Sequence, residues 1–129
     1  MEVVVQAWAP MLLSLLRIVS GVLFLEHGTA KLFRFPAGAF QDIHLNSMAG
    51  YAGIIELVCG VFLILGLFTR PIALIASGTM AVGYFYAHAP QGFFPVLNHG
   101  ELAVLYCFVF LYIAAAGPGP WSVDEARRK

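Results

Sequence analysis

The sequence is poor in charged residues. Only 11% of its 129 residues are Asp, Glu, Lys or Arg, whereas soluble domains contain about 25%. Hydrophobic residues make up 60% of the chain, and the mean hydropathy is +0.85. A single domain of this size buries only about two-thirds of the surface of its unfolded chain, so it cannot hide this much apolar surface from water. These values exclude a disordered chain, argue against a soluble globular domain, and indicate an integral membrane protein.

The sequence also lacks an excess of charge of either sign and has little cysteine. Seven basic and seven acidic residues give a formal net charge of zero, so nothing points to nucleic acid as a partner. Cys59 and Cys107 both lie inside apolar segments. Their positions match no CxxC pair and no zinc motif, and both are predicted to be core residues.

Four apolar segments approach the length of about 20 residues that crosses a bilayer. They predict helices over residues 10–27, 49–68, 71–88 and 100–116. Glu2 and Arg17 do not fit a secretory signal, so we expect the first helix to be retained. The predicted fold class is all-α: an integral membrane four-helix bundle that forms one domain over residues 1–129.

The connections between the helices predict the topology. Thr69 and Arg70 form a tight turn, so the second and third helices are expected to be antiparallel neighbours. The connection over residues 28–48 is long and mixed in composition. Four basic residues lie on the side of both termini and two, Lys31 and Arg34, on the other. This difference predicts that both termini are cytoplasmic.

Two charged residues interrupt the predicted spans. A charge at the centre of a span costs about 2.5–3.5 kcal/mol on insertion scales, so it usually has a function. Arg17 and Glu56 each lie roughly 10 Å from the start of their helix, on opposite sides of the bilayer. Arg17 either reaches Glu56 or extends to the cytoplasmic surface. An ion pair between them could hold the bundle together or belong to a functional site.

Helical periodicity places these charges on faces rich in small residues, which allow helices to approach closely in lipid. The three faces predicted to meet comprise Arg17, Ser20, Gly21, His27 and Lys31; Ala49, Ala52, Gly53, Glu56 and Gly60; and Ser77, Met80, Ala81, Tyr84 and His88.

A second group of polar residues is expected at the outer boundary of the membrane. It contains Glu26, His27, Lys31, His88, His99, Glu101 and Tyr106. Glu26 joins this group only if the first helix bends near Gly28. Simpler interpretations remain open: Asn98 and Glu101 fit a capping box, and Lys31 and His27 could anchor the helix at the headgroups. Tyr84 and Tyr106 could be core aromatics.

Three histidines of this group could bind zinc or iron together with an acidic residue. The candidate ligands are His27, His88, His99 and either Glu26 or Glu101. No HxxxH or ExxH spacing supports such a site, and no metal is predicted.

Several short motifs resemble the DoxX family. They are His27-Gly28-Thr29-Ala30-Lys31-Leu32, Glu56 with Gly60, Leu65-Gly66-Leu67, Thr69-Arg70, Gly100-Glu101-Leu102, Tyr106, and the tail Gly117-Pro118-Gly119-Pro120-Trp121-Ser122-Val123-Asp124. The resemblance covers about residues 12–124. It implies a multi-pass protein of a bacterial-type inner membrane. Some relatives resemble the large subunit of thiosulfate:quinone oxidoreductase, and others are linked to quinone detoxification or membrane redox complexes.

The favoured hypothesis is a quinone-associated redox membrane protein that works with a redox partner protein. His88 or His99 would donate a hydrogen bond to the quinone, and Glu56 or Glu101 would relay protons. The catalytic candidates are thus Glu56, His88 and Glu101. The predicted quinone pocket comprises Arg17, His27, Lys31, Glu56, Tyr84, His88, His99, Glu101 and Tyr106.

Two alternatives belong to other functional classes. The first is a non-catalytic anchor or scaffold for a redox complex, in which the polar residues form an assembly surface. The second is a small transporter or lipid-binding protein that uses Arg17 and Glu56 as a gate. The sequence leaves open whether the protein is an enzyme, and a homo-oligomer fits each hypothesis.

Overall fold

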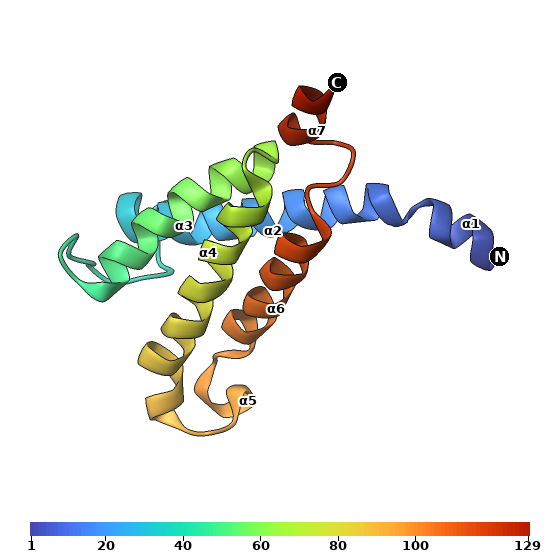
Figure 1. The fold of residues 1–129 in the computed structure, drawn as a ribbon. Coiled ribbons are helices and arrows are strands. Elements are labelled where there is room, and N and C mark those ends of the chain that lie inside the picture. The colour runs from blue at the N-terminus through green and yellow to red at the C-terminus, as the bar shows by residue number, and fades with distance from the viewer.

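The computed structural model describes all 129 residues, and they form an all-helical protein (Figure 1). The α-helices are α1 (Glu2–Ala7), α2 (Ala9–Phe33), α3 (Met48–Leu65), α4 (Thr69–Gly83), α5 (Pro95–Asn98), α6 (Glu101–Ala116) and α7 (Val123–Arg128). A π-helical turn, Tyr84–His88, and a 3-10 turn, Ala89–Gln91, continue α4. The all-α prediction is confirmed.

Three helical segments are long and apolar enough to cross a membrane. They are α2 with 25 residues, α3 with 18, and the continuous segment Thr69–Gln91 with 23. The fourth predicted span, α6, is apolar but has only 16 residues. Many large apolar side chains on these helices are exposed, as expected for a surface that faces lipid.

The predicted helix ends need three corrections. The first helix continues past residue 27 to Phe33, because Gly28 packs against α3 instead of breaking α2. The second ends at Leu65, before residue 68, because Gly66 adopts a left-handed conformation with φ of 67°. The third begins at Thr69 and loses α-helical geometry after Gly83.

The four long helices are arranged as two pairs. Helix α2 packs along α3, and α4 packs along α6. Helices α3 and α4 also contact one another, as predicted, but they spread apart away from their turn (Figure 1). That turn is formed by Gly66, Leu67 and Phe68, whereas Thr69 and Arg70, predicted to form it, are the first residues of α4. Within the first pair, a Cβ on Gly28 would lie 2.6 Å from the Leu57 nitrogen, and one on Gly60 would lie 2.8 Å from the Leu25 Cα. Small residues are therefore required where α2 crosses α3.

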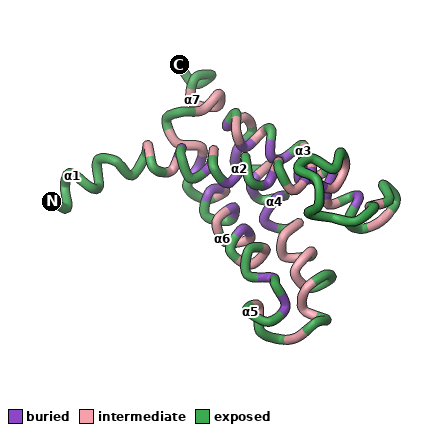
Figure 2. Tube along the Cα trace, turned by 180° about the vertical axis from the view of Figure 1, so that it is seen from behind, coloured by how far each residue is buried: buried purple, intermediate pink, exposed green.

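The core lies where the two pairs meet. Figure 2 shows the buried residues gathered in this central region, whereas α1 and the connection between α2 and α3 are mostly exposed. The core contains Phe24, Cys59, Leu63, Ala73, Ala76, Tyr106, Phe110 and Ile113. The Phe24 ring packs edge-on against Phe110, with ring centroids 4.9 Å apart, and against Tyr106 at 5.7 Å. These contacts join α2 to α6 and thus connect the two pairs.

Arg17 is fully buried and does not pair with Glu56, so the first of the two alternatives for this side chain was wrong. Its Nε donates to the Leu63 carbonyl oxygen at 2.8 Å. Its Nη1 and Nη2 donate to the carbonyl oxygens of Pro118 and, at 2.6 Å, Trp121. Glu56 lies seven residues before Leu63 on α3, roughly 10 Å farther along the axis. The segment after α6 returns to α2 at this level and supplies carbonyl groups that helical periodicity could not reveal.

Further polar contacts fix this returning segment to the turn between α3 and α4. The Asp124 carboxylate accepts hydrogen bonds from the backbone N–H groups of Phe68 and Thr69, each at 2.9 Å. Burial opposes ionisation of Asp124, but these hydrogen bonds and the charge of Arg127 lower its pKa below the ordinary value. Arg70 donates to the carbonyl oxygens of Ala114 and Ala115, at the end of α6. The chain after α6 therefore binds α2 at Arg17 and the turn between α3 and α4 at Asp124.

The first prediction concerns Arg17. We expect Arg17→Met to lower the free energy of unfolding by about 2–4 kcal/mol, because three carbonyl groups lose their donor in a region with little water. Unfolding in mixed detergent micelles would measure the change. Arg34→Met is the matched control: Arg34 pairs with Asp42, but its side chain is 69% exposed, so the loss should stay below about 1 kcal/mol. Equal losses for the two variants would contradict a structural role for Arg17.

Candidate functional site

A cavity of about 620 Å³ lies between the two helix pairs. Its walls come from α2, α3, α4, the π-helical turn and α6, with Phe40 from the connection after α2. Most of the lining is apolar, including Phe24, Ile55 and Met80. The polar lining residues that the sequence predicted are His27, Lys31, Glu56, His88, His99 and Tyr106. A few polar groups in an apolar cavity are typical of small-molecule sites.

A buried ion pair lies in the wall of this cavity. Lys31 Nζ is 2.8 Å from Glu56 Oε1, and the two side chains are 13% and 2% exposed. The close packing of α2 on α3 brings them together, since a Cβ on Gly53 would already lie 3.1 Å from the Lys31 Cβ. Lys31 therefore contacts α3 and is not a headgroup anchor. It, and not Arg17, is the basic residue that pairs with Glu56.

Two polar atoms beside the ion pair have no partner within the protein. They are Glu56 Oε2 and the Tyr106 hydroxyl oxygen, both buried. An unsatisfied buried polar group costs about 1–3 kcal/mol. Both residues line the cavity. A ligand that donates to Glu56 and accepts from Tyr106 would remove this cost.

Two histidine rings on the cavity wall are held by backbone carbonyl groups. His27 Nδ1 lies 2.8 Å from the Leu23 carbonyl oxygen, and His88 Nδ1 lies 3.0 Å from that of Asn98. A carbonyl oxygen only accepts, so Nδ1 carries the proton in both rings. In the neutral ring Nε2 is then an acceptor, and on protonation it becomes a donor.

Asn98 organises the end of the cavity near the π-helical turn. It is fully buried, and its Nδ2 donates to the Tyr84 hydroxyl at 3.1 Å and to the Gly92 carbonyl at 2.8 Å. Its Oδ1 accepts from the Gly100 N–H at 2.9 Å. The N-cap of α6 is Gly100, so the predicted capping box of Asn98 and Glu101 does not form. Asn98 instead orders the connection between the π-helical turn and α6, and its carbonyl oxygen accepts from His88.

Three predicted pocket residues lie outside the cavity lining. Arg17 binds the returning C-terminal segment, Tyr84 contacts Asn98, and Glu101 is exposed at the start of α6. Glu26 is also absent from the lining, since α2 continues without a break at Gly28. His27, His88 and His99 do not come together with an acidic residue as a group that could hold a metal ion.

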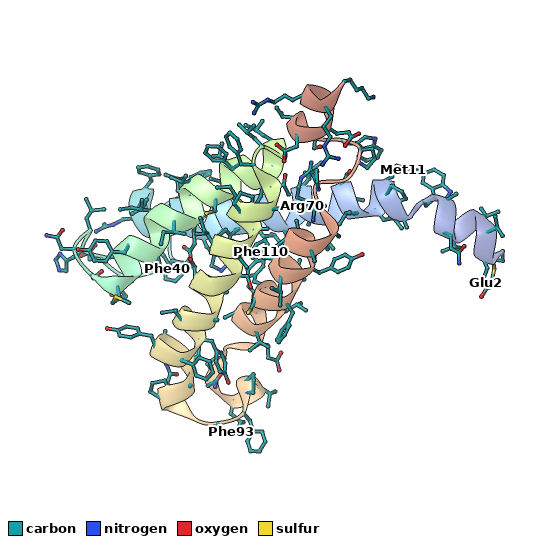
Figure 3. The ribbon with its side chains drawn as sticks, viewed as in Figure 1. Glu2, Met11, Phe40, Arg70, Phe93 and Phe110 are labelled. Atoms are coloured by element: carbon teal, nitrogen blue, oxygen red, sulfur yellow. The ribbon has the colours of Figure 1, made fainter.

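Phe40 was not predicted as a site residue. Lys31 Nζ lies 5.3 Å from the centroid of its ring, and the His27 ring lies 6.3 Å from it. Figure 3 shows Phe40 beside α3, far from Arg70 at the other end of that helix. The ring thus lines the cavity beside Lys31 and His27. A single Phe in a connection of mixed composition gives no sequence signal of this contact.

The second prediction tests the ion pair. Lys31→Met should lower the free energy of unfolding by about 3–5 kcal/mol, because it leaves the Glu56 carboxylate buried without a counter-charge. Adding Glu56→Gln should recover most of this loss. Unfolding in mixed micelles measures both changes, and the exposed pair Arg34 and Asp42 provides the control cycle. A double variant that shows the full sum of the single losses would contradict the pairing.

Comparison with known proteins places this architecture in a family. The DoxX family model matches residues 12–89, which run from α2 to the connection after the π-helical turn. The chain is 44% identical over 129 residues to an uncharacterized protein of Haemophilus influenzae, covering 93% of each sequence. It is 31% identical over 133 residues to an uncharacterized membrane protein of Mycobacterium tuberculosis, covering 88% of this chain and 80% of that protein. No solved structure matches. The chain belongs to the DoxX family and is a multi-pass bacterial membrane protein.

Proposed function

We propose that the cavity binds the head ring of a quinone and that the protein serves a membrane redox partner. The single observation that supports this proposal is that Glu56 Oε2 and the Tyr106 hydroxyl are buried without a partner, in two residues that line an apolar cavity. The ring of a quinone or quinol is flat and apolar, and its polar atoms lie at two opposite edges. It therefore needs apolar walls and a few hydrogen-bonding groups.

The residues present fit both redox forms of such a ring. A quinone oxygen can accept from the Tyr106 hydroxyl, and a quinol hydroxyl can donate to Glu56 Oε2. Phe24, Ile55 and Met80 offer apolar contact to the ring faces. The volume of about 620 Å³ falls within the range of roughly 300–1,000 Å³ that is common for small-molecule pockets.

Protons are the part of the chemistry that this chain can supply. Reduction of a quinone to a quinol consumes two electrons and two protons, and the electrons would come from the partner protein. Glu56 Oε2 can give or take a proton at the ring, while Lys31 compensates its charge when it is ionised. His27 and His88 line the same cavity, and we propose that they exchange protons between this carboxylate and water.

The predicted orientation of the protein in the membrane determines the side from which protons would reach the cavity. If both termini are cytoplasmic, the turn between α3 and α4 is cytoplasmic too, and the cavity lies toward the outer side of the membrane. Proton exchange through His27 and His88 would then occur with the outer aqueous phase.

The third prediction concerns the two unpartnered groups. Glu56→Gln should weaken quinol binding about 10–100-fold, and Tyr106→Phe should weaken quinone binding about tenfold, because each removes one hydrogen bond to the ring. Bound ligand is counted by solvent extraction of protein equilibrated in detergent micelles, against protein-free micelles. Tyr112→Phe is the control, since Tyr112 is on α6 but exposed and outside the cavity.

Two results would overturn the proposal. One is the absence of saturable quinone binding to the wild-type protein. The other is unchanged affinity in both variants while each remains folded. Either result would favour the scaffold hypothesis, in which the polar cluster is an assembly surface.

A further inference from the structure

Two glycines on α4, Gly78 and Gly83, have no packing role within the chain. Glycine weakens a helix interior relative to alanine, so it usually marks a close contact. At Gly28 and Gly60, a Cβ would meet the neighbouring helix at less than 3 Å. At Gly78 and Gly83, a Cβ would meet no atom within 4 Å. Both glycines line the cavity, so they enlarge it instead of bringing two helices together.

The cavity is closed on one side and open on the other. Phe24 and Tyr106, on α2 and α6, are 0% and 5% exposed and form the closed side. On the α3 and α4 side, the lining residues Tyr51, Val82 and Tyr86 are more than half exposed. These two helices spread apart below their turn (Figures 1 and 3). Both belong to segments that can span the membrane, so the opening between them faces lipid.

The buried polar residues and the exposed lining residues of the cavity are different. The unpartnered atoms belong to Glu56 and Tyr106, which are 1% and 5% exposed, and Lys31 Nζ lies 5.3 Å from the Phe40 ring centroid. The lining toward the opening includes Gly78, Val82 and Gly83 of α4 and the Tyr86 ring of the π-helical turn. This order suits a molecule that enters sideways from the bilayer with its polar end first and keeps an apolar end in the opening.

We infer that the gap between α3 and α4 is a lateral entrance and that the ligand carries a long apolar tail, which lies over Gly78 and Gly83. The identity of the head ring rests on the function proposed above. The ligand class is thus a prenylated quinone, and a tail-free, water-soluble quinone would use only the inner part of the site. Beside the glycines, the buried, unpartnered Glu56 and Tyr106 atoms are a second observation that points to a ligand in this cavity.

The test adds bulk to the entrance without touching the head site. Gly83→Leu, and separately Gly78→Leu, should fold at least as stably as the wild type, since leucine favours a helix and nothing lies within 4 Å. Each variant should bind a benzoquinone with a long prenyl tail at least tenfold more weakly. Each should bind the same benzoquinone without a tail within twofold of wild type. Ala115→Leu, on the exposed face of α6 and outside the cavity, should change neither affinity.

The outcomes separate this inference from the proposed function. Unchanged binding of the tailed quinone in both glycine variants would overturn the entrance. Equal loss of the tailed and tail-free quinones would also overturn it, because the leucine would then be blocking the head site. If neither quinone binds the wild-type protein, the proposed function fails, and the inference about the tail fails with it.

Discussion

The buried ion pair between Lys31 and Glu56 constrains the rest of the structure. A carboxylate inside a bilayer needs a counter-charge from the protein, because water is scarce there. Lys31 can supply it only if α2 continues past residue 27 and packs closely on α3. Glycines at 28 and 53 permit that approach. The pair then forms part of the cavity wall, with one Glu56 oxygen bound by Lys31 and the other without a partner.

The two charged residues that interrupt the apolar spans have different roles. Arg17 is paired within the protein, since three carbonyl oxygens accept hydrogen bonds from its guanidinium nitrogens. These bonds fix the returning C-terminal segment to α2 and α3. Only one Glu56 carboxylate oxygen has a partner in the protein, which is Lys31, and the other oxygen has none. Because an unsatisfied polar atom is costly in a low-dielectric environment, it is evidence for a ligand, whereas a fully satisfied one is evidence for a structural role. Thr69 Oγ1 is also buried without a partner, but Thr69 lies outside the cavity lining. The unpartnered atoms of Glu56 and Tyr106 therefore support the proposal of a ligand site in the cavity.

The sequence predicted what depends on composition and helical periodicity. The apolar spans and the small-residue faces of α2 and α3 follow from these patterns. The sequence also grouped Glu56 with His27, Lys31 and Tyr106, and all four line the cavity. The partners of Arg17 could not be predicted, because they are backbone carbonyls of a non-helical segment distant in sequence. The π-helical turn and the contact of Phe40 with Lys31 depend on tertiary packing and leave no periodic signal. The sequence also gives no sign that Gly78 and Gly83 differ from the glycines that pack between helices, because the open space beside them depends on the tertiary structure.

The most direct test of this account is to locate bound quinone on the protein within its own membrane. An azido derivative of a prenylated quinone would be activated by light in membrane vesicles, and the labelled residues would be mapped by mass spectrometry of peptides. The account predicts labelling on the cavity-facing parts of α3, α4 and α6, near Glu56, Gly83 and Tyr106, and its loss when excess unmodified quinone competes. Labelling spread over lipid-facing residues of all helices and insensitive to competition would contradict a quinone site in this cavity.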